Sequence, residues 1–385
     1  MNELFGAFRR YSGASPVGLY TVRTVPLQNS AVNLISIFRL FTNFAEKNEI
    51  KSQIMSISNR FSLLSVVFSA LIVASVSCNG GHGYQFAEGV VWNTTYHITY
   101  SGPAGLADSI SATLDEVGGS LSAFDPASLV SRLNGADSCR VDSHLASVYR
   151  ASAIINRESG GLFDPTLGPL IQAWGFGKGH KASADTLRLD SLLALTGFTK
   201  TSFDGQVIRK SDPAMQFNFS SIAKGYGCDA VAAMLRRNGV DNFLVEIGGE
   251  IRCAGVNPRN QKWNVSVDAP VPDPKGSTHQ SQITVRVSDA GMATSGNYRN
   301  FHGSGEAAYG HTISPLTGRP VKNDMLSATV IAQTAMEADG YATACMAMGF
   351  KKASEMADRL GLAVFFVMSD SAVWESKAFT EIRQQ

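Results

Sequence analysis

Apolar and polar residues follow two kinds of pattern from about residue 90 onward. Stretches rich in β-branched and aromatic residues, some of them alternating with polar ones, indicate strands, whereas apolar residues that recur every three or four positions indicate helices. The predicted strands lie at 90–100, 199–210 (a hairpin that turns at Asp204-Gly205), 241–249, 263–270, 283–289, 326–333 and 362–370. The predicted helices lie at 106–121, 143–157, 221–239 and 340–348.

These strands and helices intermix without a repeat or a long low-complexity linker. Such an arrangement predicts one domain of the α+β class over residues 90–385. With 44% hydrophobic and 17% charged residues, the composition is ordinary for a globular protein with a sizeable core. The formal net charge of +1 gives no reason to expect a nucleic-acid partner, so function must reside in local groups of residues.

The first ninety residues show a different pattern. The apolar run "FSLLSVVFSALIVA" at 61–74 is short for a membrane span. It follows "MSISNR" and precedes small residues, which is the layout of a secretory signal. We therefore predict an N-terminal extension over 1–54, with Met55 as the true start, then a signal peptide over 55–77 and a linker over 78–89.

Cys78 stands directly after the predicted signal, as in bacterial lipoproteins. This position predicts a lipid anchor on Cys78 and an exported protein held at the membrane, facing the periplasm. Ordinary cleavage after Ser77 is the alternative, because Ser75 and Ser77 also fit a small-x-small site. The other cysteines are scattered without a C-x-x-C pair, and we expect them to be separate thiols; they are Cys139, Cys228, Cys253 and Cys345.

Two segments have the composition of binding loops. "SGGLFDPTLGPLIQAWGFGKG" at 159–179 is dense in glycine, proline and aromatic residues, which suits either close approach of a ligand or structural turns. "NFSSIAKGYGCD" places Ser220, Ser221 and Lys224 at the start of a helix. Free amides beside a lysine form an anion site, although either serine could instead cap the helix. The chain contains neither a P-loop nor a G-x-G-x-x-G motif.

Two further segments carry candidate chemistry. His311 precedes a Pro-Leu-Thr-Gly turn and could act as a base, a donor to phosphate or a ligand. Asp339 and Thr343 are four residues apart, so on a helix they share one face. Two oxygen ligands suit a hard cation such as Mg²⁺, but Asp339 would also serve as the N-cap of a helix over 340–348.

Taken together and in order, these segments resemble the ApbE family, the FAD:protein FMN transferases. The motifs are "WNTTYHITY", "LSAFDPASLVSRLN", "GGLFDPTLGPLIQAWGFG", "NFSSIAKGYGCD", "LVEIGGEIRCAG" with "ATSGNYRNF", and "HTISPLTGRP" followed by "EADGYATACMAMG". The resemblance implies a T-fold-like α+β domain, with mixed or antiparallel sheets and flanking helices, that binds FAD and Mg²⁺. It also implies transfer of FMN from FAD to a threonine of an acceptor protein, typically a membrane redox-complex subunit, with a new phosphoester bond and release of AMP.

The resemblance further implies roles for individual residues. Catalytic roles fall to His311, as the residue that assists the attacking threonine, and to Asp339. The metal positions match Asp339 and Thr343 together with Ser221 and Ala342, the last two through their carbonyl groups. The positions that match FAD contacts are Trp92, Phe124, Leu162, Phe163, Asp164, Asn218, Lys224 and Ile313.

The chain departs from the family pattern at three places. Asn93 stands where glycine is usual, Asn218 where aspartate is usual, and Ser314 where aspartate or asparagine is usual. The metal motif and His311 are intact, which favours an active enzyme. An FAD pyrophosphatase that releases FMN and AMP, or a flavin-binding lipoprotein without catalysis, are the alternative functions.

Overall fold

The computed structural model describes residues 83–177, 188–270, 280–296, 301–302, 309–322 and 324–385. The predicted extension, the signal peptide and the lipid anchor at Cys78 all lie outside these residues. Among the residues that are described, none of the helices is long and apolar enough to cross a bilayer.

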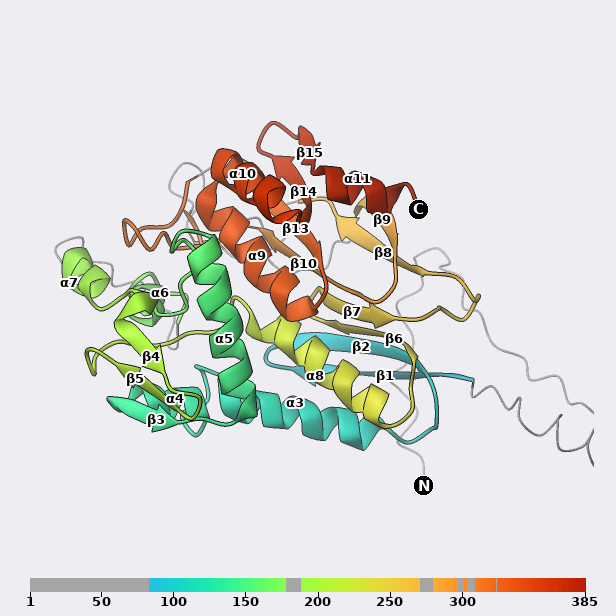
Figure 1. Cartoon of the computed structure of the whole chain (residues 1–385), viewed down its shortest axis with the longest axis horizontal. Helices are drawn as coiled ribbons and strands as arrows, with labels where there is room; N and C mark the ends of the chain where they lie inside the picture. Colours follow the sequence, from blue (N-terminus) through green and yellow to red (C-terminus); the bar gives the residue numbers. More distant parts are fainter. Residues whose placement is uncertain (1–82, 178–187, 271–279, 297–300, 303–308, 323) are drawn as a thin grey trace, which may run out of the picture. The chain divides into compact units, whose positions relative to one another are not determined.

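An eight-stranded sheet forms the centre of this domain, and every neighbouring pair in it is antiparallel. Its strands, in spatial order, are β1 (Tyr84–Val91), β2 (Thr94–Ser101), β6 (Asn242–Ile247), β7 (Glu250–Ala254), β10 (Ala290–Gly296), β13 (Met325–Ala332), β14 (Ala363–Met368) and β15 (Val373–Glu375). The long helices that connect these strands lie on one side of the sheet, so different elements cover its two faces (Figure 1).

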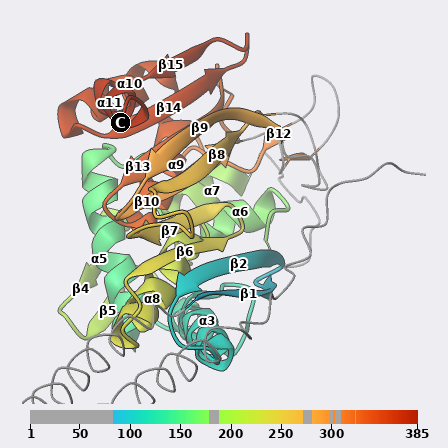
Figure 2. The same ribbon diagram turned by 90° about the vertical axis from the view of Figure 1, so that its right-hand side faces the viewer.

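Four helices cover one face of the sheet: α3 (Ala107–Leu121), α5 (Ser143–Glu158), α8 (Ala223–Arg237) and α9 (Ala335–Met348). Figure 2 shows the hairpin of β8 (Trp263–Asp268) and β9 (Ser281–Val287) on the opposite face, where helix α11 (Lys377–Arg383) also packs. Adjacent residues of β14 therefore enter different cores, as the two-residue period of a strand requires. Phe366 packs with the helices, and Phe365 stacks on Phe379 of α11.

The remaining elements surround this framework. A small sheet of β3 (Ser138–Arg140), β5 (Val207–Lys210) and β4 (Thr201–Phe203) lies beside α4 (Leu129–Asn134), with β5 in the middle. The other short elements are α6 (Gly168–Ala173), α7 (Leu189–Ala194), the 3₁₀ turn Phe198–Lys200, β11 (Phe301–His302), β12 (Tyr309–Gly310) and α10 (Phe350–Leu360).

Most predicted elements are confirmed within a few residues. The predicted hairpin at 199–210 is β4 and β5, and its turn is fixed by Asp204, whose Oδ1 accepts hydrogen bonds from Gln206 N and Val207 N. The fold class is also confirmed. The four cysteines of the domain are free thiols, with Cys139 half-buried and the other three buried.

The predicted strand at 90–100 is wrong, because two strands meet there. β1 begins at Tyr84, within the segment expected to be a linker, and turns into β2 through Trp92 and Asn93. Both turn residues have positive φ angles, 49° and 63°, as a two-residue hairpin turn that matches strand twist requires. Asparagine tolerates this conformation better than other non-glycine residues, which explains how Asn93 replaces the usual glycine.

This turn gives a direct test of stability. We expect Asn93→Ala to lower the free energy of unfolding by about 1 kcal/mol, because alanine is strained at positive φ. Asn93→Gly should be nearly neutral, since glycine adopts the same conformation freely. Urea denaturation of the two variants measures both effects, and equal stabilities would contradict the assignment of a strained turn.

Candidate active site

The largest group of predicted site residues lines one cleft of about 660 Å³ at the end of the sheet beside α8 and α9. The predicted residues found there are Phe124, Leu162, Phe163, Asp164, Asn218, Ser221, Lys224, His311, Ile313, Asp339 and Thr343. They come from segments spread over more than 200 residues of sequence. A cleft of this size is in the range of sites for cofactor-sized ligands.

Asp339 lies inside helix α9 and does not cap it, so the N-cap alternative is wrong. Helix α9 begins at Ala335, and Thr334 is its N-cap in a capping box with Glu337. The Asp339 side chain is 4% exposed and lines the cleft. Burial raises the pKa of its carboxyl group, while the charge of Lys224 and a hydrogen bond from Gly225 N oppose that rise.

Carboxylates from α8 and α9 cap each other's helices. Asp339 Oδ2 accepts a hydrogen bond of 3.0 Å from Gly225 N in the first turn of α8. In return, Asp229 of α8 accepts hydrogen bonds from Ala335 N and Met336 N, at 3.0 and 2.8 Å, in the first turn of α9. Each carboxylate is thus placed where amide groups and the helix dipole favour negative charge. No serine caps α8, so that alternative for Ser220 and Ser221 is wrong.

The crossing of the two helices is close because Gly225 has no side chain. A Cβ atom at that position would lie 2.2 Å from the carbonyl oxygen of Ala335 and 2.8 Å from Cβ of Asp339. Glycine is therefore required here for backbone approach, and this approach brings Asp339 to the start of α8.

The oxygen atoms around Asp339 have the chemistry of a magnesium site. Thr343 Oγ1, one turn further along α9, donates a 3.3 Å hydrogen bond to the carbonyl oxygen of Ser221 and lies 3.1 Å from Ser295 Oγ. Hydroxyl, carbonyl and carboxylate oxygens are the ligands of hard cations. Among the described residues, no cluster of three or more His, Cys, Asp or Glu side chains suits a metal. The match of these residues to a hard cation therefore rests on the Asp339 carboxylate together with the neutral oxygens of Thr343 and Ser221.

A buried ion pair completes this end of the cleft. Lys224 Nζ pairs with Glu250 Oε2, whose side chain is only 4% exposed. Glu250 is not among the predicted site residues, although a carboxylate directly after the Gly248-Gly249 pair, at the start of strand β7, was a readable signal. Burial lowers the pKa of Lys224, but Glu250 and Asp339 outweigh it, so the pKa lies above its ordinary value and the ammonium stays charged.

The Gly-Pro loop forms another wall of the cleft. Asp164 Oδ1 accepts hydrogen bonds from Thr166 N and Thr166 Oγ1, and its Oδ2 accepts one from Phe198 N. The carboxylate thus fixes the loop and joins it to the 3₁₀ turn Phe198–Lys200, while burial raises the pKa of Asp164. Asn218 Oδ1 accepts a hydrogen bond from Ser220 N, which an aspartate at this position could equally accept.

Aromatic side chains border the same cleft. Phe124 is partly exposed at 43%, as suits a ring that receives a ligand. The Phe176 ring lies edge-on to His311, with ring centroids 6.2 Å apart. Phe176 is not among the predicted site residues, although it belongs to the glycine- and aromatic-rich segment at 159–179.

Two predicted site residues do not line the cleft. Trp92 packs its indole in spaces left by Gly118 of α3 and Gly227 of α8, because the positive φ of the turn directs it between these helices. Ala342 is fully buried in the core on the inner side of α9. Its side chain packs in the core, and the predicted binding of metal by its carbonyl group stays a prediction.

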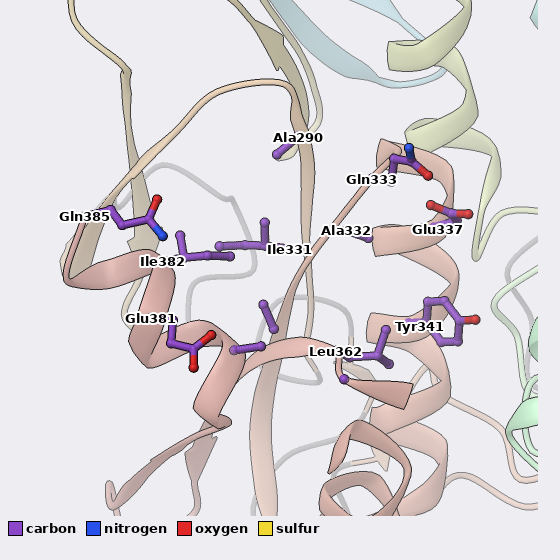
Figure 3. Close-up of a pocket in the computed structure, with 13 residues that line it drawn as sticks. Ala290, Ile331, Ala332, Gln333, Glu337, Tyr341, Leu362, Glu381, Ile382 and Gln385 are labelled. Atoms are coloured by element: carbon purple, nitrogen blue, oxygen red, sulfur yellow. The ribbon is translucent and has the colours of Figure 1, made fainter. Parts of the chain in front are cut away.

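A second hollow of about 530 Å³ lies between the ends of β13, α9 and α11 (Figure 3). None of the predicted site residues lines it, and its charged lining residues, Glu337 and Glu381, are both acidic. The first cleft also contains carboxylates, but it holds the cationic Lys224 as well, which can attract an anionic nucleotide. The first cleft is therefore the candidate active site.

An α+β domain that brings a lysine, a histidine and a group of carboxylate, hydroxyl and carbonyl oxygens to one cleft has the groups that enzymes use for phosphoryl transfer on a large ligand. The chain belongs to the ApbE family, whose model matches residues 92–366.

Curated relatives in this family match about three quarters of the chain. The chain is 34% identical to the FAD:protein FMN transferase of Vibrio cholerae, over 73% of this chain and 86% of that protein. It is 31% identical to the protein of the same name in Salmonella typhimurium, over 77% and 88%.

Solved structures show the same fold. The flavin transferase ApbE from Vibrio cholerae superimposes with a TM-score of 0.69 at 31% identity, covering 78% of this chain and 99% of that one. The Pseudomonas stutzeri flavinyl transferase ApbE gives a TM-score of 0.69 at 30% identity, over 79% and 98%.

Proposed function

We propose that this protein is an FAD:protein FMN transferase that depends on Mg²⁺, acts on a threonine of its acceptor and releases AMP. The observation that carries this proposal is the convergence of Lys224, Asp339, Thr343 and His311 on a single cleft, in a chain whose curated relatives bear that activity as their name. Binding alone would need neither a cation site nor a base.

The residues divide the task between holding the pyrophosphate and moving a proton. Lys224 attracts the anionic pyrophosphate, and Asp339, Thr343 and the Ser221 carbonyl would hold the cation. Mg²⁺ held there would neutralise charge on the pyrophosphate and polarise its phosphorus–oxygen bonds. The threonine oxygen bonds to the FMN phosphorus as the bond to AMP breaks, and the hydroxyl proton passes to His311.

The membrane setting is also part of this proposal. The apolar run at 61–74 and the following Cys78 support export and lipid anchoring of the mature chain. An anchored enzyme at the periplasmic face would meet acceptors at the same membrane, and we infer a threonine-bearing subunit of a membrane redox complex as its partner.

Three outcomes of one assay separate the candidate functions. The full chain is incubated with FAD, Mg²⁺ and a threonine-bearing redox subunit, and the products are separated by gel and chromatography. Covalent flavin fluorescence on the subunit, with AMP released in equal amount, is expected for the transferase. Free FMN with AMP identifies a pyrophosphatase instead, and unchanged FAD identifies a carrier.

The histidine can be tested separately. We expect His311→Gln to slow flavin transfer by about a hundredfold, because general-base assistance typically contributes that much or more. The affinity for FAD, measured by flavin fluorescence, should change by less than about threefold, since the base acts on the acceptor hydroxyl. Transfer at the unaltered rate would remove His311 from the mechanism.

A further inference from the structure

Glu250 is a buried carboxylate that the mechanism above does not use. It is the first residue of β7, directly after the turn formed by Gly248 and Gly249, whose φ angles are 61° and 101°. In the hairpin register it pairs with Ile247, and its side chain lies in the cleft under the first turn of α8. A buried carboxylate is costly unless a partner compensates it.

Its partner is Lys224, which is held at two points. The ammonium group pairs with Glu250, and the stem passes beside Gly248, where an added Cβ atom would lie 3.3 Å from Lys224 Cδ. The lysine side chain is still 34% exposed, so it faces the cleft while its position is fixed.

Lys224 is within the electrostatic reach of a second carboxylate. Both side chains line the same cleft, and Gly225, the residue directly after Lys224, donates its backbone N–H to Asp339. Asp339 Oδ2 is already bonded to Gly225 N, so an ammonium group at its other oxygen would occupy the position that a cation needs. A lysine stem with four rotatable carbons is long enough to change partners.

We propose that Glu250 is a positioning residue that holds the Lys224 ammonium group away from Asp339 and so leaves Asp339 open to the divalent cation. This inference rests on the proposed function for the roles of Lys224 and Asp339. It assigns Glu250 and Asp339 different tasks, because Glu250 binds the lysine and Asp339 binds the metal.

The test is a double-mutant cycle read by metal binding. Mn²⁺ affinity is measured by electron paramagnetic resonance in the full-length protein without FAD, for Glu250→Gln, Lys224→Met and the double variant. Glu250→Gln should weaken Mn²⁺ binding by about tenfold, since Lys224 then pairs with Asp339. In the Lys224→Met background the same substitution should have no further effect, because the competing ammonium group is gone.

Two results would overturn the inference. One is unchanged Mn²⁺ affinity in Glu250→Gln, and the other is an equal loss in both backgrounds, which would indicate a ligand or a purely structural role. Glu88→Gln, on the exposed side of β1, controls for loss of one negative charge. Asp339→Asn distinguishes failure of this inference from failure of the proposed function. If Asp339→Asn leaves Mn²⁺ affinity unchanged, Asp339 does not bind the cation and the proposed cation site is wrong.

Discussion

Replacing Asp339 by asparagine is expected to slow FMN transfer by roughly a thousandfold, equivalent to about 4 kcal/mol of transition-state stabilisation. Asparagine keeps the shape of the side chain and an oxygen that accepts the hydrogen bond from Gly225 N. It removes the negative charge that binds the cation, and the carboxylate is the only charged group in the proposed set of oxygen ligands. The melting temperature should therefore change little while activity is lost.

Steady-state flavin transfer at saturating FAD, together with Mn²⁺ binding, measures this effect. Asp229→Asn is the matched control, because Asp229 caps the partner helix in the same manner but does not line the cleft. The control should keep transfer within about threefold. If Asp339→Asn turned over at the wild-type rate with wild-type metal affinity, the assignment of the cation site would be wrong.

Replacing Gly225 by alanine is expected to lower stability more than the Asn93 and Asp339 substitutions do. Its Cβ atom would lie 2.2 Å from the Ala335 carbonyl oxygen and 2.6 Å from the Ala335 carbonyl carbon, both of them backbone atoms that a rotamer change cannot move. The helices α8 and α9 must separate, at a cost of about 3 kcal/mol. Thermal denaturation should show a fall of roughly 5–10 °C in the melting temperature.

The same substitution in an open helix position is the control. Gly119 of α3 has no atom within 4 Å of an added Cβ. Gly119→Ala should stabilise the protein by about 0.5–1 kcal/mol, because alanine favours the helical conformation more than glycine does. Equal effects of the two substitutions would show that helix propensity, and not the close helix crossing, determines the change in unfolding free energy at Gly225.

Local periodicity was sufficient to predict most of the fold. The helices at 106–121 and 143–157 and the hairpin at 199–210 follow from patterns within each segment, which is why they were placed correctly. The turn at Trp92 and Asn93 was missed, because its residues are not the glycine pairs that mark such turns. Asp339 was considered as a cap although Thr334 and Glu337, three residues apart, carry the signature of a capping box.

The site was predictable as a set of residues but not as a set of contacts. Motif order brought Ser221, Lys224, His311 and Asp339 into one group, and the structure places all four at the same cleft. The pairing of Lys224 with Glu250 and the capping of α9 by Asp229 join residues far apart in sequence, the latter by more than a hundred positions. No local pattern encodes which distant partner a buried charge will meet.

The mutual capping of α8 and α9 has a consequence for the way the enzyme loses activity on heating. The amides at the start of each helix depend on a carboxylate of the other, and oxygens from both helix regions make up the proposed cation site. Both helices also pack on the central sheet, so the proposed cation site is joined to the core through both of them. Inactivation and cooperative unfolding should therefore share one transition, and the catalytic centre should be among the last regions of the domain to exchange its amide hydrogens.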